Sequence, residues 1–269
     1  MESYLLSGLF LGFVMVNMLF ASGGGQDVSF SQNYNVGWGH FSINNKGGGF
    51  ESKLHLLSGL INWRIKLPES KSPGVITAFY LTSKEAQHDE IDFEFIGTNG
   101  PPYRLSTNVF TKGVGGREQS FNLWFDPSAD FHSYTILWNQ YQVVFFVDEV
   151  PIRVFKNLGN PGNYPTQGML VEGSLWDGGA WAGKIDWSKA PFRARFQGFD
   201  VDGCVVSDPS KPGSCGYTHG SAWAQQKTLN AAQMTRYQNA RSKYLNYDYC
   251  KDRSKYPQPP PECNAQIGI

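Results

Sequence analysis

The stretch HDEIDFEF (residues 88–95) alternates acidic and apolar side chains, which is the pattern of a half-buried β-strand. Successive side chains of a strand point to opposite faces of its sheet, so the apolar members are predicted to enter a core. Glu90, Asp92 and Glu94 then share the opposite face. The stretch therefore predicts a sheet with one packed face and one face that carries three carboxylates.

Three carboxylates on one sheet face repel each other and push their protonation equilibria apart. A solvated acidic edge strand is the alternative, but such a strand normally interleaves Lys or Thr to relieve the repulsion. Retaining glycoside cleavage needs two carboxyl groups in different protonation states, about 5–5.5 Å apart. Because positions i and i+4 start ~13 Å apart on a flat strand, curvature and side-chain lean must bring them together. We assign Glu90 as nucleophile, Asp92 as its hydrogen-bonding helper and Glu94 as acid/base.

Short strand signatures separated by turn residues occupy most of the chain. Aromatic residues make up 15% of it and glycine occurs 30 times, which fits short strands and tight turns. The pattern predicts an all-β sandwich or jelly roll. The predicted strands are 60–67, 75–81, 87–95, 133–138, 143–147, 150–155, 169–176 and 192–199, with Asp148-Glu149 as a hairpin turn.

The last third of the chain has a different character. Asn230 with Gln233 predicts a capped helix that runs to Tyr244, and the proline-rich segment 256–261 cannot continue it. All four cysteines lie here, without the spacing of a zinc site, so no metal is expected. They allow three disulfide pairings. Proximity favours Cys204 with Cys215 and Cys250 with Cys263.

The charge balance and the N-terminus bear on partners and location. With 23 basic and 23 acidic residues, the chain lacks the basic surplus of a nucleic-acid binder, so a neutral polymer suits it better. The apolar run 5–20, followed by small residues at 21–24, predicts a signal peptide over residues 1–23 and a secreted protein. A membrane anchor is the alternative, but the run is short for the ~20 residues that a span needs.

The chain as a whole resembles the plant xyloglucan endotransglucosylase/hydrolases of glycoside hydrolase family 16. The resemblance rests on HDEIDFEFIG (88–97), GVITAFYLTS (74–83), the run 106–139, SLWDGGAWAG (174–183) and YCKDRSKYPQPPPEC (249–263). It implies a curved, concanavalin-like jelly-roll catalytic domain over residues 24–200 and a C-terminal extension over 201–269 with one helix and two disulfides. It further implies the pairing of neighbouring cysteines and an apoplastic, cell-wall location.

The resemblance also implies which residues contact the glucan. Trp176 and Trp181 resemble aromatic platforms, whose flat faces stack on sugar rings. Lys255 stands where the family usually has an arginine on the acceptor side, and Lys cannot make the bidentate contacts of Arg. The full set of predicted substrate contacts is Glu94, Ser106, Thr107, Asn108, Gly116, Arg117, Glu118, Trp176, Trp181, Gly183 and Lys255.

Three departures from the family pattern are visible. Between Trp38 and Phe50 about fifteen residues are absent, which predicts a missing or badly formed strand. No N-x-S/T sequon occurs anywhere in the chain. The segment 181–187 is shorter than the family's usual loop on the acceptor side.

The leading hypothesis is a cofactor-free endotransglucosylase that cuts the β-1,4-glucan backbone of xyloglucan and joins it to another xyloglucan chain. The donor is xyloglucan polymer, the acceptor is a xyloglucan chain or oligosaccharide, and a monomer is expected. Hydrolysis in the same cleft is the nearest alternative. A catalytically impaired glucan-binding protein is the alternative from another class, because losing a strand could exceed the whole stability of about 5–15 kcal/mol.

Overall fold

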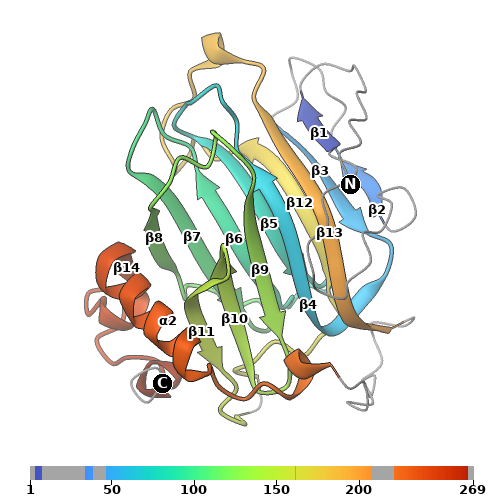
Figure 1. The fold of residues 1–269 in the computed structure, drawn as a ribbon, viewed down its shortest axis with the longest axis vertical. Helices are drawn as coiled ribbons and strands as arrows, with labels where there is room; N and C mark the ends of the chain where they lie inside the picture. Colours follow the sequence, from blue (N-terminus) through green and yellow to red (C-terminus); the bar gives the residue numbers. More distant parts are fainter. Residues whose placement is uncertain (1–3, 8–33, 39–46, 161, 207–220, 266–269) are drawn as a thin grey trace.

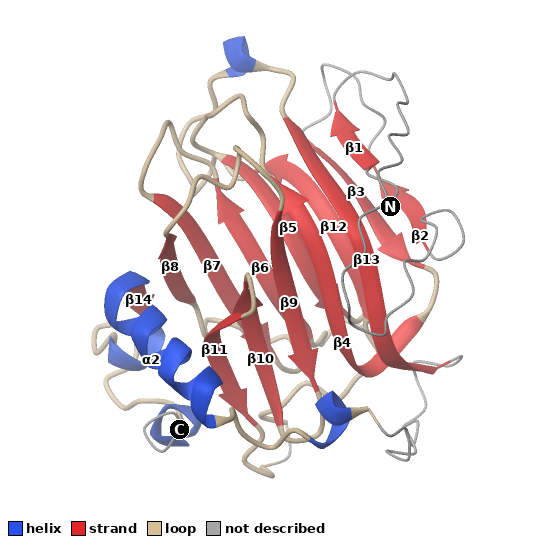
Figure 2. Ribbon diagram, viewed as in Figure 1, coloured by secondary structure: helices blue, strands red, loops and turns tan. Residues whose placement is uncertain are grey.

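The computed structural model describes residues 4–7, 34–38, 47–160, 162–206 and 221–265. Two antiparallel sheets pack face to face, and the α-helices of the described ranges lie in the C-terminal part (Figures 1 and 2). The six-stranded sheet has the order β1 (Tyr4–Ser7), β13 (Arg193–Val206), β4 (His55–Lys66), β9 (His132–Trp138), β10 (Gln142–Val147) and β11 (Val150–Lys156). The eight-stranded sheet has the order β14 (Leu245–Asp248), β8 (Gln119–Leu123), β7 (Tyr103–Phe110), β6 (Glu90–Ile96), β5 (Val75–Thr82), β12 (Leu170–Asp177), β3 (Gly47–Ser52) and β2 (Tyr34–Trp38). This arrangement confirms the predicted all-β sandwich.

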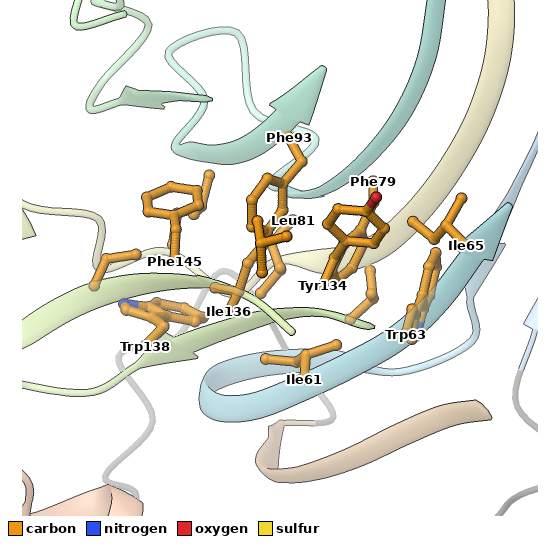
Figure 3. Packing of buried hydrophobic residues seen from close by; sticks show 14 of the residues in the cluster. Ile61, Trp63, Ile65, Phe79, Leu81, Phe93, Tyr134, Ile136, Trp138 and Phe145 are labelled. Atoms are coloured by element: carbon orange, nitrogen blue, oxygen red, sulfur yellow. The ribbon is translucent and has the colours of Figure 1, made fainter. Parts of the chain in front are cut away.

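Alternate side chains from both sheets meet in one hydrophobic core (Figure 3). In β4, Ile61, Trp63 and Ile65 point inward and have no exposed surface, while the residues between them are partly exposed. The indole of Trp63 stacks on Phe79 of β5 with ring centroids 4.5 Å apart, and Phe79 stacks on Phe93 of β6 at 5.9 Å. Each such buried side chain stabilises the fold by about 1.5–3 kcal/mol, so the inner face of β6 is firmly anchored.

The hairpin between β10 and β11 follows the prediction. Asp148 and Glu149 have φ angles of 46° and 62°. Two consecutive residues with positive φ match a turn whose twist suits the right-handed twist of the paired strands. The prediction of a two-residue turn at this point is confirmed.

The C-terminal extension packs against the outer face of the six-stranded sheet. Helix α2 (Ala231–Tyr244) begins with the predicted capping box, in which Asn230 and Gln233 cap each other's backbone. Leu229 and Tyr237 join a second hydrophobic cluster with Val144 and Phe146, the residues of β10 that face away from the main core. The helix therefore covers strand surface that would otherwise expose apolar side chains to water.

The C-terminal end is closed by a disulfide. Cys250, in the 3₁₀ helix η3 (Tyr249–Lys251), is bonded to Cys263 in α3 (Pro261–Ala265), with an S–S distance of 2.06 Å. This confirms one predicted pair. Cys204 is also disulfide-bonded, but its predicted partner Cys215 lies outside the described residues.

Two strands lie within or across segments whose boundaries remain predictions. Residues 4–7, within the predicted signal peptide, form β1 against residues 193–196 of β13. Strand β13 continues past residue 200, and its pairing with β4 resumes at Asp200 after a bulge. Near the predicted deletion, β2 and β3 are both formed and paired with each other. No helix of the described ranges is long and apolar enough to cross a membrane.

Candidate active site

Strand β6 lies near the middle of the eight-stranded sheet and carries the three predicted carboxylates on the face away from the core. Its neighbours are β7 on one side and β5 on the other. Glu94 lies opposite Ser106 and Ala78, and Asp92 lies opposite Asn108 and Tyr80. The apolar residues between the carboxylates are buried in the main core, as the alternation predicted.

Burial shifts the ionisation of all three carboxyl groups in the same direction. Burial, with the nearby charges of Glu90 and Glu118, raises the pKa of Glu94 from 4.5 to about 7. Burial also raises the pKa of Glu90, and the charge of Glu172 adds to it, whereas a hydrogen bond from Thr82 and the charge of His88 lower it. Glu94 is therefore suited to hold a proton near neutral pH, which is what a general acid needs.

Asp92 is the most enclosed of the three. It is 5% exposed, and its Oδ1 is buried without a hydrogen-bond partner among the described residues. Burial and then the charges of Glu94 and Glu90 raise the pKa of Asp92, and the Arg153 guanidinium lowers it. A protonated Asp92 can donate a hydrogen bond to a neighbouring carboxylate, so its environment fits the predicted helper role.

Arg153 supports this part of the sheet from the core side. It is fully buried in β11, and one of its terminal nitrogens donates to the Thr107 carbonyl at 2.7 Å and to the Thr107 hydroxyl at 2.9 Å. The other donates to the Arg117 carbonyl at 2.7 Å. The guanidinium also lies 5.9 Å from the ring centroid of Tyr249, in the C-terminal extension. Arg153 thus ties β7, the loop before β8 and the extension together.

A pocket of about 270 Å³ lies on the β7–β8–β14 side of strand β6. Four of its lining residues were predicted to contact substrate: Ser106, Glu118, Trp181 and Lys255. Glu118 and Lys255 are ion-paired at 3.0 Å across this pocket. Sequence reasoning missed three further lining residues that can offer polar groups, namely Arg104, Ser120 and Tyr247.

The two predicted aromatic platforms lie at the end of β12 and in the loop after it. The ring centroids of Trp176 and Trp181 are 6.4 Å apart, and Trp181 is 56% exposed. An exposed indole face can stack on a sugar ring. Its position at the pocket is therefore consistent with sugar stacking.

Some predicted contacts are placed elsewhere. The Thr107 side chain faces the core and has no exposed surface, and its hydroxyl donates to the Gln119 carbonyl. The Arg117 guanidinium is bonded to Glu262 at 2.8 Å and to the backbone carbonyls of Val109 and Val114. The structure thus gives both side chains internal partners and does not bring them into the pocket.

The remaining predicted contacts either form hydrogen bonds with the backbone near the site or lie at its border. The Asn108 Oδ1 accepts from the backbone N–H groups of Val109 and Arg117, which fixes the loop before β8. Gly116 has a φ of +83° and its carbonyl accepts from the Tyr256 hydroxyl at 2.7 Å. Gly183, with a φ of +103°, lies close against Pro73 and Gly74.

The other half of the face, over β5, β12 and β3, carries a cluster that sequence reasoning missed. Glu172 of β12 is 5% exposed, accepts from the Tyr80 hydroxyl at 2.8 Å and is ion-paired with Lys84. Lys84 is also paired with Glu51 of β3 at 3.0 Å. A signal was present: Glu172 precedes Trp176 by four residues, and strand alternation places them on the same face.

Comparison with known proteins agrees with this arrangement. The model of the glycosyl hydrolases family 16 matches residues 17–189, and that of the xyloglucan endo-transglycosylase C-terminus matches residues 218–263. Xyloglucan endotransglucosylase/hydrolase protein 2 of Arabidopsis thaliana is 48% identical over 261 residues, covering 88% of this chain and 89% of that protein. Xyloglucan endotransglucosylase protein 34 of Populus tremula x Populus tremuloides is 46% identical over 268 residues, covering 90% of each.

Two solved structures show the same fold at low sequence identity. A Crh5 transglycosylase in complex with NAG has a TM-score of 0.55 at 20% identity, covering 70% of this chain and 86% of that one. A prokaryotic β-1,3-1,4-glucanase has a TM-score of 0.52 at 17% identity, covering 77% of this chain and 100% of that one. With the family models and the plant relatives, they leave one conclusion: the chain belongs to the xyloglucan endotransglucosylase/hydrolase group of glycosyl hydrolase family 16.

Proposed function

We propose that the protein is a retaining xyloglucan endotransglucosylase, which cuts the β-1,4-glucan backbone of xyloglucan and joins the cut chain to another xyloglucan chain. The observation that carries the proposal is the row Glu90, Asp92 and Glu94 on the open face of one strand, with the pKa of Glu94 raised to about 7. The names of the plant relatives supply the substrate.

In the first half of the reaction, the Glu90 carboxylate attacks the anomeric carbon of a backbone glucosyl unit. The bond from that carbon to the glycosidic oxygen breaks, and Glu94 gives its proton to the departing oxygen. The product is a glycosyl ester on Glu90. Asp92 donates a hydrogen bond to Glu90 and adjusts its ionisation.

In the second half, Glu94 is ionised and acts as a base. It takes the proton from the 4-hydroxyl of an acceptor chain, whose oxygen attacks the anomeric carbon and releases Glu90. Two inversions at this carbon leave a β-linkage, and every group returns to its starting state.

The two halves of the open face take the two sugar chains. We assign the acceptor to the pocket with Glu118, Trp181 and Lys255, because the family resemblance places Lys255 on that side. The donor then lies across β5, β12 and β3. Secretion to the cell wall, where xyloglucan is found, belongs to the same proposal and is supported by the predicted signal peptide.

Hydrolysis remains a second candidate in the same cleft. Water can replace the acceptor hydroxyl, and a barrier difference of ~1.4 kcal/mol changes the partitioning tenfold. The shortened loop after Trp181 favours neither outcome by itself.

The test is incubation of the secreted protein with high-molecular-weight xyloglucan and labelled xyloglucan oligosaccharide. Transfer of label into polymer with little new reducing sugar supports the transglucosylase. Reducing ends released regardless of acceptor move the assignment to hydrolase. Glu90→Ala is the matched control: it should abolish both signals, because it removes the carboxylate that forms the ester. Retained activity in that variant would overturn the catalytic assignment.

A further inference from the structure

The cluster on the donor half of the open face contains four residues from three strands and one loop. Glu172 and Tyr80 lie opposite each other on β12 and β5, and Glu51 lies opposite Glu172 on β3. Lys84 follows β5 and reaches both carboxylates. The register therefore continues the row of Asp92 across the sheet, from Asp92 to Tyr80, Glu172 and Glu51.

Burial and charge make this cluster unlike an ordinary surface ion pair. The Glu172 side chain is 7% exposed, whereas the Lys84 side chain is 53% exposed. A buried carboxylate needs its partners, because leaving its charge uncompensated is costly. Glu172 thus acts as a fixed anchor that orients the Tyr80 hydroxyl and the Lys84 ammonium at the surface of the open face.

The cluster has hydrogen-bonding groups that its internal contacts do not use. The Tyr80 hydroxyl donates its proton to Glu172 and is also hydrogen-bonded to the Ser174 side chain, so one oxygen lone pair is left to accept a hydrogen bond. The Lys84 ammonium has three protons, and among the described residues two carboxylates take two of them. One acceptor and one charged donor, both hydrogen-bonded to the Glu172 carboxylate, complement a neutral sugar hydroxyl.

The position of the cluster in the sheet indicates which side of the cleaved bond its sugar lies on. Strands are about 4.8 Å apart, so β12 lies roughly 10 Å from the catalytic strand. Glu172 and Glu51 are therefore too far away to touch the anomeric carbon that Glu90 attacks, whereas Tyr80, on β5, lies one strand from the carboxylates, opposite Asp92. It lies on the side opposite the Glu118–Lys255 pair, whose lysine borders the acceptor pocket.

We propose that Lys84 and Tyr80, held in place by Glu172 and Glu51, form a donor-side subsite that binds a hydroxyl of a neutral sugar on the donor side of the bond that is cleaved. This inference rests on the proposed function. It makes the open face a pair of lysine-bearing sites, Lys84 for the donor and Lys255 for the acceptor, on either side of the carboxylate strand.

The experiment is a kinetic comparison of Lys84→Met with Lys255→Met. Initial rates of label transfer are measured against xyloglucan polymer at saturating oligosaccharide, and then against oligosaccharide at saturating polymer. Lys84→Met should raise the KM for polymer about tenfold, the effect of one lost charged hydrogen bond, and leave the KM for oligosaccharide within twofold. Lys255→Met should give the opposite pattern.

Two further variants test whether the effect is specific to this cluster. Tyr80→Phe keeps the ring and removes the hydroxyl, so it should raise the KM for polymer by a smaller factor. Lys66→Met removes a lysine ion-paired with Glu69 at the end of β4 in the other sheet and should change neither constant. A polymer KM unchanged in Lys84→Met, or raised no more than the oligosaccharide KM, overturns the subsite.

A separate readout distinguishes failure of this inference from failure of the proposed function. If the wild-type protein transfers no label from xyloglucan, the proposed function fails. The subsite is then tested by calorimetric titration of cellotetraose into Glu90→Ala and into the double variant with Lys84→Met. Weaker binding in the double variant supports the subsite, and equal affinity overturns it.

Discussion

The two halves of the open face are built in different ways. The half over β5, β12 and β3, which we propose binds the donor, takes its polar groups from the sheet and the loop directly after β5. The half over β7, β8 and β14, which we propose binds the acceptor, depends on residues from the far end of the chain: Glu262 binds Arg117, and Asp248 binds both Gln119 and Arg241. Lys255, which borders the acceptor pocket, also comes from this extension.

This difference predicts how far the effect of a substitution spreads from each half of the open face. Donor-side groups are anchored by neighbours in the same sheet, so their loss should remain local. Acceptor-side groups are anchored through buried charges that join the extension to β7 and the loop before β8. Because a buried charge that loses its partner is costly, damage on this side should weaken the fold as well as the site.

The largest effect is expected for Arg153→Met. This substitution leaves two backbone carbonyls and the Thr107 hydroxyl without their buried donor, so the free energy of unfolding should fall by about 3–5 kcal/mol. It should also raise the pKa of Asp92 further, because the guanidinium is the charge that lowers it. Urea unfolding at pH 6 measures the loss, with the exposed Arg193→Met as control. A loss below about 1 kcal/mol would mean that the two halves do not differ in this way.

Glu262→Gln should have the next largest effect. Glu262 is 4% exposed and pairs with the Arg117 Nε at 2.8 Å, so a neutral amide leaves the arginine partly compensated and costs about 2–3 kcal/mol. Because Arg117 precedes Glu118, the KM for acceptor oligosaccharide should rise while that for polymer stays constant. Urea unfolding and the two-substrate kinetics check both parts. Equal changes in both KM values would contradict the predicted difference between the two halves.

Glu94→Gln tests the strand between the halves through its pH dependence. The pKa of Glu94 is raised to about 7 in the folded protein, so the folded state holds this proton more tightly than the unfolded state. The carboxyl therefore destabilises the fold increasingly as pH rises from about 4.5 to 7. The amide cannot ionise, so after discounting for partial exposure the variant should be about 1–2 kcal/mol more stable than wild type at pH 8.

At pH 4 the two proteins should have nearly the same stability, because Glu94 is protonated in the folded state and mostly protonated in the unfolded state. Thermal unfolding between pH 4 and pH 8 measures the difference, and Glu149→Gln in the exposed hairpin turn is the control. A stability gain that is independent of pH would show that repacking, not ionisation, is its cause.

Glu172→Gln is expected to give the smallest loss of stability, about 1 kcal/mol, because the lysine that it releases is half exposed and regains water. The comparison with Glu262→Gln is direct, since both glutamates are buried and both lose one ion pair. Chemical unfolding of the two variants side by side is the measurement. If Glu172→Gln costs as much as Glu262→Gln, the donor half is not the more local of the two.

Local alternation was enough to predict the strand that carries the carboxylates, its inward face and the hairpin at Asp148-Glu149. The helix cap at Asn230 was also readable, because its partners are three residues apart. Strands β7 and β8 were not predicted from the pattern. In β7 the core position opposite Phe93 is the polar Thr107, which a buried arginine from another sheet requires.

The candidate site residues that lie on one strand could be predicted from the sequence. Those that depend on contacts between distant parts of the chain could not. In the sequence Arg117 has the pattern of a surface cation. Its buried partner, Glu262, lies 145 residues later in the chain and is its neighbour only in the folded protein. Lys84 and Glu172 are 88 residues apart and become neighbours only when β12 pairs with β5. No local pattern contains these pairings, because they follow from the order of the strands.

The stacked rings of Trp63, Phe79 and Phe93 have a mechanical consequence. They link β4 of one sheet to β5 and β6 of the other, and interiors at this packing density have low compressibility. The floor under Glu90, Asp92 and Glu94 is therefore stiff. When a sugar chain enters, the side chains above the sheet and the loop with Trp181 must take up the displacement, and the spacing of the carboxylates stays as the fold sets it.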